Sequence, residues 1–161
     1  MRPAVVIPTY NESDNIGTLI AELRKTLAEL VIIVVDDNSP DGTGRLLDEI
    51  AAGDPAVHPI HRPAKLGLGT AHIAGMKWAM SQELEPILTM DADFSHSPHF
   101  LPDLIRATNA GDLVIGSRYV PGGGTDNCTL PRKALSRGAN TFARVILGLT
   151  ANDCTAGFRA Y

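Results

Sequence analysis

The sequence predicts an α/β fold in which a mostly parallel sheet carries helices on both faces. Short runs of apolar residues alternate along the chain with stretches whose apolar residues recur at helical spacing. Residues 31–35 are continuously β-branched or apolar, which is typical of a strand buried on both faces. A chain of 161 residues is long enough to bury a sizeable core, so we expect residues 1–161 to form a single domain.

The first half of the chain contains three strand patterns, each followed by a helical pattern. We expect strands at residues 4–7, 31–35 and 57–60, and helices at residues 16–30, 43–50 and 70–80. Pro8 is expected to stop the first strand, and Pro59 makes the third strand an edge strand. A loop with two glycines, residues 65–70, precedes the third helix.

The second half of the chain continues the alternation. We expect strands at residues 87–90 and 113–115, a helix beginning near Pro98, a further helix at residues 135–149 and an approach to one more strand at residues 153–161. The chain stops in this structured segment without a polar tail, so we expect a C-terminal portion to be missing.

Composition excludes several classes of function. The net charge of −4 and the low aromatic content of 5% argue against a nucleic-acid partner. Two distant cysteines, Cys128 and Cys154, favour reduced thiols in a cytoplasmic protein. The longest apolar run, residues 30–35, is too short to span a bilayer, although the protein could work at a membrane surface.

Acidic residues follow three of the predicted strands. Asp91 and Asp93 come directly after residues 87–90, Asp36 and Asp37 follow the second strand, and Glu12 follows the first. Because the carboxyl ends of parallel strands share one edge of a sheet, we expect these groups to converge there. Two carboxylates one residue apart favour a divalent cation between them, and oxygen ligands suit Mg²⁺ or Mn²⁺.

The remaining polar residues complete a site for phosphate groups. Asp37 is expected to be free to accept hydrogen bonds from a base, whereas Asp36 is expected to be structural. Arg118 follows a predicted strand at the same edge, and Arg132 and Ser136 lie four residues apart on a predicted helix. An arginine fork suits a second phosphate.

The strand ends and loops together resemble a known family. The segments that carry the resemblance are residues 6–12, 35–43, 65–69, 90–93, 116–120 and 155–161. They are similar to the inverting family 2 glycosyltransferases with a GT-A Rossmann-like fold, and more narrowly to polyprenyl-phosphate (dolichyl-phosphate) mannosyltransferases. The resemblance implies Mg²⁺- or Mn²⁺-dependent transfer of mannose from GDP-mannose to a polyprenyl phosphate, at the cytoplasmic face of a membrane.

The resemblance also implies roles for individual residues. The nucleotide would contact Pro8, Tyr10, Glu12, Val35, Asp37, Asp91, Ala92 and Asp93. The metal would be held by Asp91 and Asp93 with Ser95, and the acceptor phosphate by Arg118, Arg132 and Ser136; Asp91, Asp93 and Arg118 would be catalytic. A phosphate monoester, with a second pKa of about 6, needs no dedicated general base to attack.

Three alternatives remain open from the sequence. A relative that uses UDP-glucose with the same lipid acceptor would share the same motifs. A non-catalytic nucleotide-binding fragment would keep the metal site without turnover. A receiver-type signalling domain would use Asp36, Asp37 and Asp91 as its acidic cluster. In that fold, however, the acidic pair follows the first strand, whereas Asp36 and Asp37 follow the second predicted strand.

Overall fold

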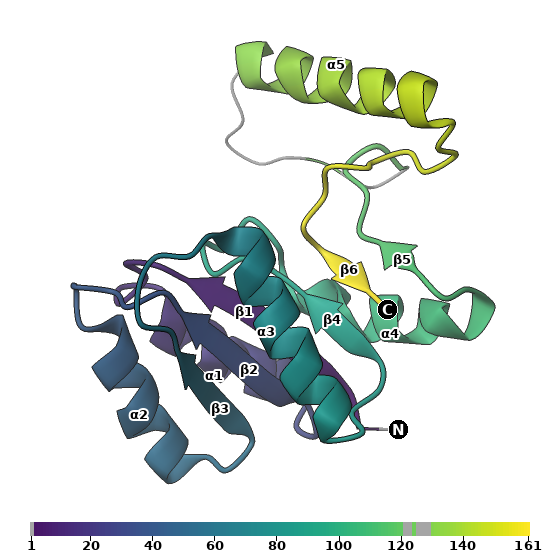
Figure 1. The fold of residues 1–161 in the computed structure, drawn as a ribbon. Coiled ribbons are helices and arrows are strands. Elements are labelled where there is room, and N and C mark those ends of the chain that lie inside the picture. The colour runs from purple at the N-terminus through teal and green to yellow at the C-terminus, as the bar shows by residue number, and fades with distance from the viewer. Residues whose placement is uncertain (1, 121–123, 125–129) are drawn as a thin grey trace.

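One six-stranded sheet organises the molecule, with strand order β3-β2-β1-β4-β6-β5 (Figure 1). The structure, a computed structural model, describes residues 2–120, 124 and 130–161, without the side chains of residues 130–135 and 137. The strands are β1 (Ala4–Thr9), β2 (Val31–Asp36), β3 (Val57–His61), β4 (Ile87–Thr89), β5 (Val114–Ile115) and β6 (Arg159–Ala160). Strands β3, β2, β1 and β4 are parallel, and β6 runs antiparallel to both of its neighbours, so the predicted mostly parallel sheet is confirmed.

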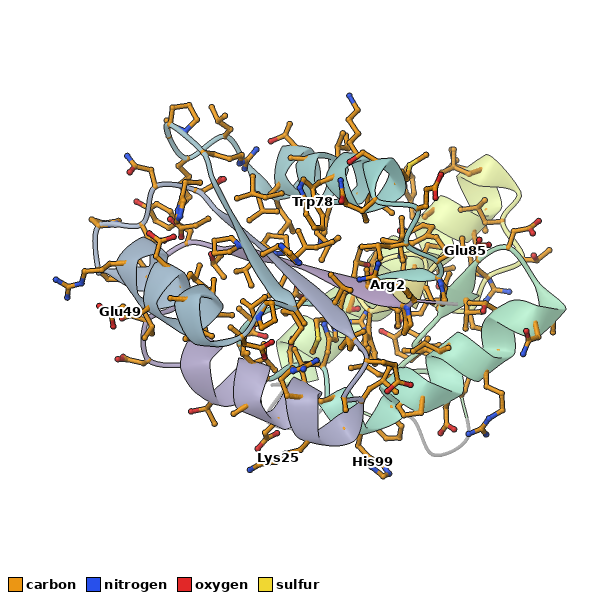
Figure 2. All side chains as sticks on the ribbon, turned by 90° about the horizontal axis from the view of Figure 1, so that it is seen from below. Arg2, Lys25, Glu49, Trp78, Glu85 and His99 are labelled. Atoms are coloured by element: carbon orange, nitrogen blue, oxygen red, sulfur yellow. The ribbon has the colours of Figure 1, made fainter. Side chains whose placement is uncertain are left out.

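Helices cover both faces of the sheet, as the sequence predicts. They are α1 (Ile16–Thr26), α2 (Thr43–Gly53), α3 (Leu68–Ser81), α4 (Leu101–Ala107) and α5 (Leu130–Leu147), with short 3₁₀ turns at Pro98–Phe100 and Thr108–Ala110. Helices α1, α2 and α4 contribute to one apolar cluster and α3 to the other. Figure 2 shows the sheet between α3, which carries Trp78, and α1, which carries Lys25.

The amphipathic pattern of the first helix explains its position. Ile16, Leu19, Ile20 and Leu23 recur at helical spacing and are all buried in α1. The helix ends at Thr26, earlier than the predicted residue 30, because Leu27 adopts an extended backbone. Leu30 is nevertheless fully buried, so its side chain reaches the same core from the loop before β2.

Helix α3 approaches the sheet through small residues. Ala71, Gly75 and Ala79 are spaced four residues apart and are the buried residues of this helix. A Cβ atom at Gly75 would lie 2.4 Å from the Cγ1 atom of Val6 on β1. The close approach therefore requires a glycine at this position.

Pro8 does not stop β1, contrary to the sequence prediction. The strand runs to Thr9, and Pro8 pairs with Val35 in the parallel register with β2. The backbone N–H groups of even-numbered residues in β1 point toward β4, as the hydrogen bond from the Ala4 N–H to the Pro86 carbonyl shows. Pairing with β4 ends at Val6, so the N–H that Pro8 lacks has no ladder partner to lose.

Helix α5 lies beyond the carboxyl end of β5, away from the two helix layers (Figure 1). Its hydrogen bonds to the rest of the chain include one from Ser136, which meets the Tyr119 hydroxyl at 2.9 Å, and those of Asn140, which bonds to the 153–155 segment. Several large apolar side chains of its second half are exposed: Phe142, Val145, Ile146 and Leu147. Within the described ranges, no helix is long and apolar enough to cross a membrane.

Candidate functional site

Three strand ends meet at one edge of the sheet, as predicted. Strand β1 lies between β2 and β4, and the backbone N–H of Asp37 donates to the carbonyl of Thr9 at 3.0 Å. Left-handed backbone follows each strand, at Asn11 (φ 62°), Asn38 (φ 56°) and Phe94 (φ 59°). Asparagine tolerates this conformation, but a bulky residue such as Phe94 rarely adopts it. Strained backbone of this kind concentrates at functional sites, and Phe94 lies directly after Asp93.

The Asp91-Ala92-Asp93 segment presents its carboxylates to solvent. The Asp91 side chain is 37% exposed, and Asp93 is an exposed residue in the turn after β4. The backbone N–H of Ser95 donates to the Asp93 carboxylate at 3.0 Å. Partial burial raises the pKa of Asp93, but hydrogen bonds from Ser95 outweigh this effect and leave the pKa below its usual value. Asp93 is therefore ionised at neutral pH.

His96 lies beside the two acids and is uncharged at neutral pH. Its Nδ1 atom accepts a hydrogen bond from the backbone N–H of Asp91 at 3.0 Å. Burial lowers the pKa of His96, despite the opposing charges of Asp91 and Asp93. A neutral imidazole agrees with the acceptor role of Nδ1, and it leaves the acids as the dominant local charge.

These residues fit a divalent cation only in partnership with a ligand. Two accessible carboxylates and the Ser95 hydroxyl are the oxygen donors that Mg²⁺ and Mn²⁺ prefer. In the described part of the chain, no group of three or more His, Cys, Asp or Glu residues is arranged to hold a metal ion. Magnesium is commonly bound by one or two carboxylates together with substrate phosphates and water, and this donor set matches that pattern.

Asp36 is structural, as the sequence predicts. It is buried at the end of β2 and accepts hydrogen bonds from the Thr9 hydroxyl at 3.1 Å and the Ser39 backbone N–H at 3.0 Å. These bonds tie the end of β1 to the turn after β2. Asp36 therefore fixes the relative position of two of the three strand ends.

The expectation that Asp37 is free to bind a base is wrong in this structure. Its side chain is buried, and one carboxylate oxygen accepts from the guanidinium of Arg62. The other oxygen accepts from the backbone N–H groups of Leu66 and Gly67, at 3.0 and 3.1 Å. Asp37 thus orders the glycine-containing loop before α3.

Arg62 is a site residue that the sequence reasoning missed. Besides Asp37, its guanidinium donates to the Thr70 hydroxyl at 2.7 Å and to the Gly67 carbonyl at 3.0 Å. Arg62 directly follows β3 at the same edge as the acids. Its place just after a predicted strand is a signal comparable to that of Arg118, but the strand pattern around Pro59 is weak.

The β1 turn lies next to this loop. The Lys65 ammonium is 3.7 Å from the centre of the Tyr10 ring, a cation–π contact. The Glu12 carboxylate accepts from the Asn15 side chain at 2.9 Å, and the Glu12 backbone N–H donates to the Thr43 hydroxyl at 3.0 Å. Pro8 and Glu12 are half-buried and Tyr10 is exposed, so the predicted nucleotide-binding turn is accessible.

Two predicted nucleotide contacts have no exposed side chain. Val35 is completely buried in the core beneath α3, and Ala92 is buried in the opposite core cluster. Val35 exposes no atoms, main chain included, and Ala92 is 3% exposed, so the structure gives the predicted contacts of these two residues no open surface.

Arg118 is held by a buried acid. Its Nε and Nη2 atoms each donate to the carboxylate of Asp153 at 2.7 Å, and Nη2 also donates to the Thr155 hydroxyl at 2.7 Å. Burial raises the pKa of Asp153, but the hydrogen bonds and charge of Arg118 lower it to about 2. The sequence prediction placed Arg118 facing a phosphate and did not include Asp153, which lies in the turn before β6.

The two other predicted acceptor residues lie on α5. Ser136 meets the hydroxyl of Tyr119, the residue after Arg118, so it lies close to this ion pair. Arg132 belongs to the same helix, but its side chain lies outside the described part of the structure. Their role toward an acceptor phosphate stays a prediction.

A cavity of about 390 Å³ opens at the carboxyl ends of β2 and β3. It is lined by Asp36, Asn38, Ser39, Pro40, Gly42, Gly44, Arg45, Asp48, His61 and Arg62. The cavity adjoins the Asp37–Arg62 pair from the side of α2, and Asp91 and Asp93 do not line it. The carboxylate pair follows the carboxyl end of β4, outside this cavity.

Two curated relatives match almost the whole chain. Polyprenol monophosphomannose synthase of Mycolicibacterium smegmatis is 48% identical over 162 residues, which cover 99% of this chain and 61% of the relative. Undecaprenyl-phosphate mannosyltransferase of Micrococcus luteus is 47% identical over 161 residues, covering 100% of this chain and 66% of the relative. The chain therefore spans less than two thirds of the length of either relative.

Comparison with solved structures supports the fold, and a family model covers nearly the whole chain. The structure of S. aureus TarS in complex with UDP matches 75% of this chain and 38% of that chain, with a TM-score of 0.60 and 26% identity. The α/β architecture is thus the GT-A Rossmann-like one that the motifs predict, which excludes the receiver alternative. The model for glycosyl transferase family 2 matches residues 4–161, and we conclude that the chain belongs to this family.

Proposed function

We propose that this chain is the catalytic part of an enzyme that transfers mannose from GDP-mannose to a polyprenyl phosphate with inversion. The observation that carries the proposal is the accessible carboxylate pair, Asp91 and Asp93, beside two ordered loops at the carboxyl edge of the sheet. The names of two relatives at 48% and 47% identity support mannose as the sugar and a polyprenyl phosphate as the acceptor.

The acidic pair suits a nucleoside diphosphate as the departing group. Asp91, Asp93 and Ser95 would hold Mg²⁺ or Mn²⁺ together with the diphosphate oxygens. When bound, this cation supplies positive charge that offsets the charge growing on the departing diphosphate. The Asp37–Arg62 pair would order the loop at the side of the nucleotide.

The turn after β1 is the proposed place for the nucleoside. Pro8, Tyr10 and Glu12 line this turn, and Lys65 covers the Tyr10 ring from the neighbouring loop. The lysine ammonium adds a positive charge beside this turn. A base that enters here would meet polar groups of Glu12 and the aromatic face of Tyr10.

The acceptor would approach from the side of α5. Its phosphate is ionised near neutral pH and attacks the anomeric carbon directly, as the diphosphate leaves from the opposite face of the sugar. Arg132 and Ser136 would bind this phosphate, and the Arg118–Asp153 pair would position Ser136 through the neighbouring Tyr119. The task of the protein is then positioning and electrostatic stabilisation.

The exposed apolar residues of α5 suit a protein that works at a membrane surface. Phe142, Val145 and Ile146 are each more than 60% exposed, which is unusual for side chains of this size. We place the protein at the cytoplasmic face of a membrane, where these residues would enter the lipid headgroup region. The reactive phosphate of a polyprenyl lipid lies at the same level.

A transfer assay tests the proposed reaction. Radiolabelled GDP-mannose and a polyprenyl phosphate in detergent are incubated with the protein, with Mn²⁺ or with EDTA. We expect labelled lipid only with the metal. Formation of product in EDTA would contradict the metal site. Cation-dependent GDP binding without any product from this chain would favour the non-catalytic fragment.

A second donor deserves the same assay because the TarS structure, which shares the fold, contains UDP. UDP-glucose replaces GDP-mannose in a parallel reaction with the same acceptor. Preferential transfer of glucose would overturn the assignment of the donor and leave the acceptor assignment intact.

Vesicle binding tests the membrane proposal. We expect the protein to co-sediment with vesicles that contain anionic lipid, and we expect Val145→Asp to reduce the bound fraction several-fold. Ile73→Asp, on the exposed face of α3, is the matched control because Ile73 is also more than half exposed. Equal binding of the two variants would contradict a role for α5.

A further inference from the structure

We propose that His96 is the positioning residue of the candidate metal site: it holds the Asp91 main chain, and its loss weakens the binding of a divalent cation with GDP. This inference rests on the proposed function, because it assigns a role within the same site. The sequence motifs assign no role to His96.

His96 lies close to both the main chain and the carboxylate of Asp91. The Nδ1 atom accepts from the Asp91 backbone N–H at 3.0 Å and lies 3.8 Å from the Asp91 carboxylate. The bond spans the turn that contains Asp93 and Phe94, so it closes this turn into a ring. A turn closed in this way fixes the Asp91 main chain relative to His96.

The imidazole ring is in turn held by the segment before β6. It stacks on the Phe158 ring with centroids 5.1 Å apart and an interplanar angle of 12°. Phe158 is buried, and its carbonyl accepts from the Gly116 backbone N–H at 2.8 Å. The ring orientation is therefore determined by the core and by the end of β5.

Gly157 completes the support. A Cβ atom at this position would lie 3.3 Å from an Asp91 carboxylate oxygen and 3.3 Å from the His96 Cε1 atom. The Gly157 carbonyl also accepts from the Thr89 hydroxyl at 2.8 Å, which ties it to β4. Gly157 thus contacts both Asp91 and His96, and a side chain at this position would require one of them to shift by a few tenths of an ångström.

The arrangement matches the chemistry of an outer-shell partner. The His96 Nδ1 atom already accepts a hydrogen bond from the Asp91 backbone N–H. It therefore supports the ligand residue Asp91 and does not itself bind the cation through this atom. Loss of such partners typically lowers metal affinity about 10- to 100-fold. The hydrogen bond and the ring stacking can be separated by substitution.

Mn²⁺ titration in the presence of GDP, followed by the electron paramagnetic resonance signal of free Mn²⁺, tests the inference. His96→Phe keeps an aromatic ring on Phe158 and removes the acceptor, so we expect about 10-fold weaker binding or more. His96→Asn keeps an acceptor near the Nδ1 position, and we expect it to bind within about threefold of the original protein. Original affinity in His96→Phe would overturn the proposal.

Gly157→Ala is an independent variant that leaves His96 in place. We expect weaker Mn²⁺ binding, because the added methyl group requires the Asp91 carboxylate or His96 to shift by a few tenths of an ångström. Gly111→Ala is the control, since a Cβ atom there meets nothing within 4 Å. Equal Mn²⁺ binding in both variants, with unchanged thermal unfolding, would overturn the proposed support by Gly157. If the unsubstituted protein bound no Mn²⁺ with GDP, the proposed function itself would fail.

Discussion

Asp91 and Asp93 have different surroundings although one residue separates them. Asp91 lies against His96 and Gly157, with its main chain tied to the imidazole. Asp93 lies in the exposed turn, and its described hydrogen bond comes from Ser95, two residues further on. We therefore expect Asp91 to be the fixed partner of a cation and Asp93 to be the one that adjusts when a ligand arrives.

Substitution of Asp93 tests the carboxylate pair directly. Asp93→Asn removes one negative charge and keeps the shape of the side chain, so we expect GDP binding to lose its dependence on Mn²⁺. Isothermal titration calorimetry with and without Mn²⁺ measures the effect. Asp103→Asn on α4 is the matched control because Asp103 is exposed and pairs with Arg106 on the surface. Cation-dependent binding that survives in Asp93→Asn would remove Asp93 from the site.

At the scale of the single element, α3 shows how packing against the sheet depends on small residues. Gly75 lies directly over Val6 and Val35, which belong to the strands that lead to Thr9 and Asp37. The same helix begins at the loop ordered by Asp37 and Arg62. The depth at which α3 sits therefore also sets the position of this loop.

Alanine substitutions at two glycines of α3 separate packing from helix propensity. We expect Gly75→Ala to lower the free energy of unfolding by about 1–3 kcal/mol, because the new Cβ atom overlaps Val6. Gly69→Ala, at an exposed position with nothing within 4 Å, should leave stability unchanged or raise it by up to about 1 kcal/mol. Urea unfolding measures both. A stabilised Gly75→Ala variant would contradict the close contact.

At the scale of the whole molecule, the ion pair between Arg118 and the buried Asp153 links the sheet to α5. Asp153 accepts from Arg118 at the end of β5 and lies 3.3 Å from the Asn140 side-chain nitrogen of α5. Asn140 also accepts from the Cys154 backbone N–H at 2.7 Å. Among the described residues, polar contacts therefore link α5 to the turn before β6, whereas helices α1, α2, α3 and α4 pack on the sheet through apolar side chains.

This cluster should make stability depend on pH at the acid end. The pKa of Asp153 is about 2 in the folded chain, below its value of 3.8 in a model peptide. The stabilisation is complete above the unfolded pKa and is lost as the pH falls toward the folded pKa, between about pH 4 and 2. It amounts to about 2 kcal/mol. We expect Asp153→Asn to lack this part of the acid dependence in urea unfolding; the same slope in both proteins would contradict the ion pair.

Much of the architecture was predictable because it depends on local periodicity. The β-branched runs and the apolar stripe of α1 predicted β2, α1 and the parallel order of the sheet, and the structure confirms them. The end of β1 was not predictable, since the tolerance of Pro8 depends on how far β4 extends beside it. The antiparallel direction of β6 was also not predictable, because the residues of a short strand do not indicate whether it runs parallel or antiparallel to its neighbours.

The sequence by itself determined the family, the sheet edge and the Asp91–Asp93 pair, because these follow from residue types at short spacing next to predicted strands. Only the tertiary structure decided which charges are already occupied. Arg62 neutralises Asp37 and Asp153 neutralises Arg118, from 25 and 35 residues away along the chain. Such pairs depend on how distant strand ends meet, and burial favours them because an isolated buried charge is costly. Of the two aspartate pairs that follow β2 and β4, Asp36 and Asp37 are buried and Asp91 and Asp93 are accessible, so the second pair is the one we propose for the chemistry.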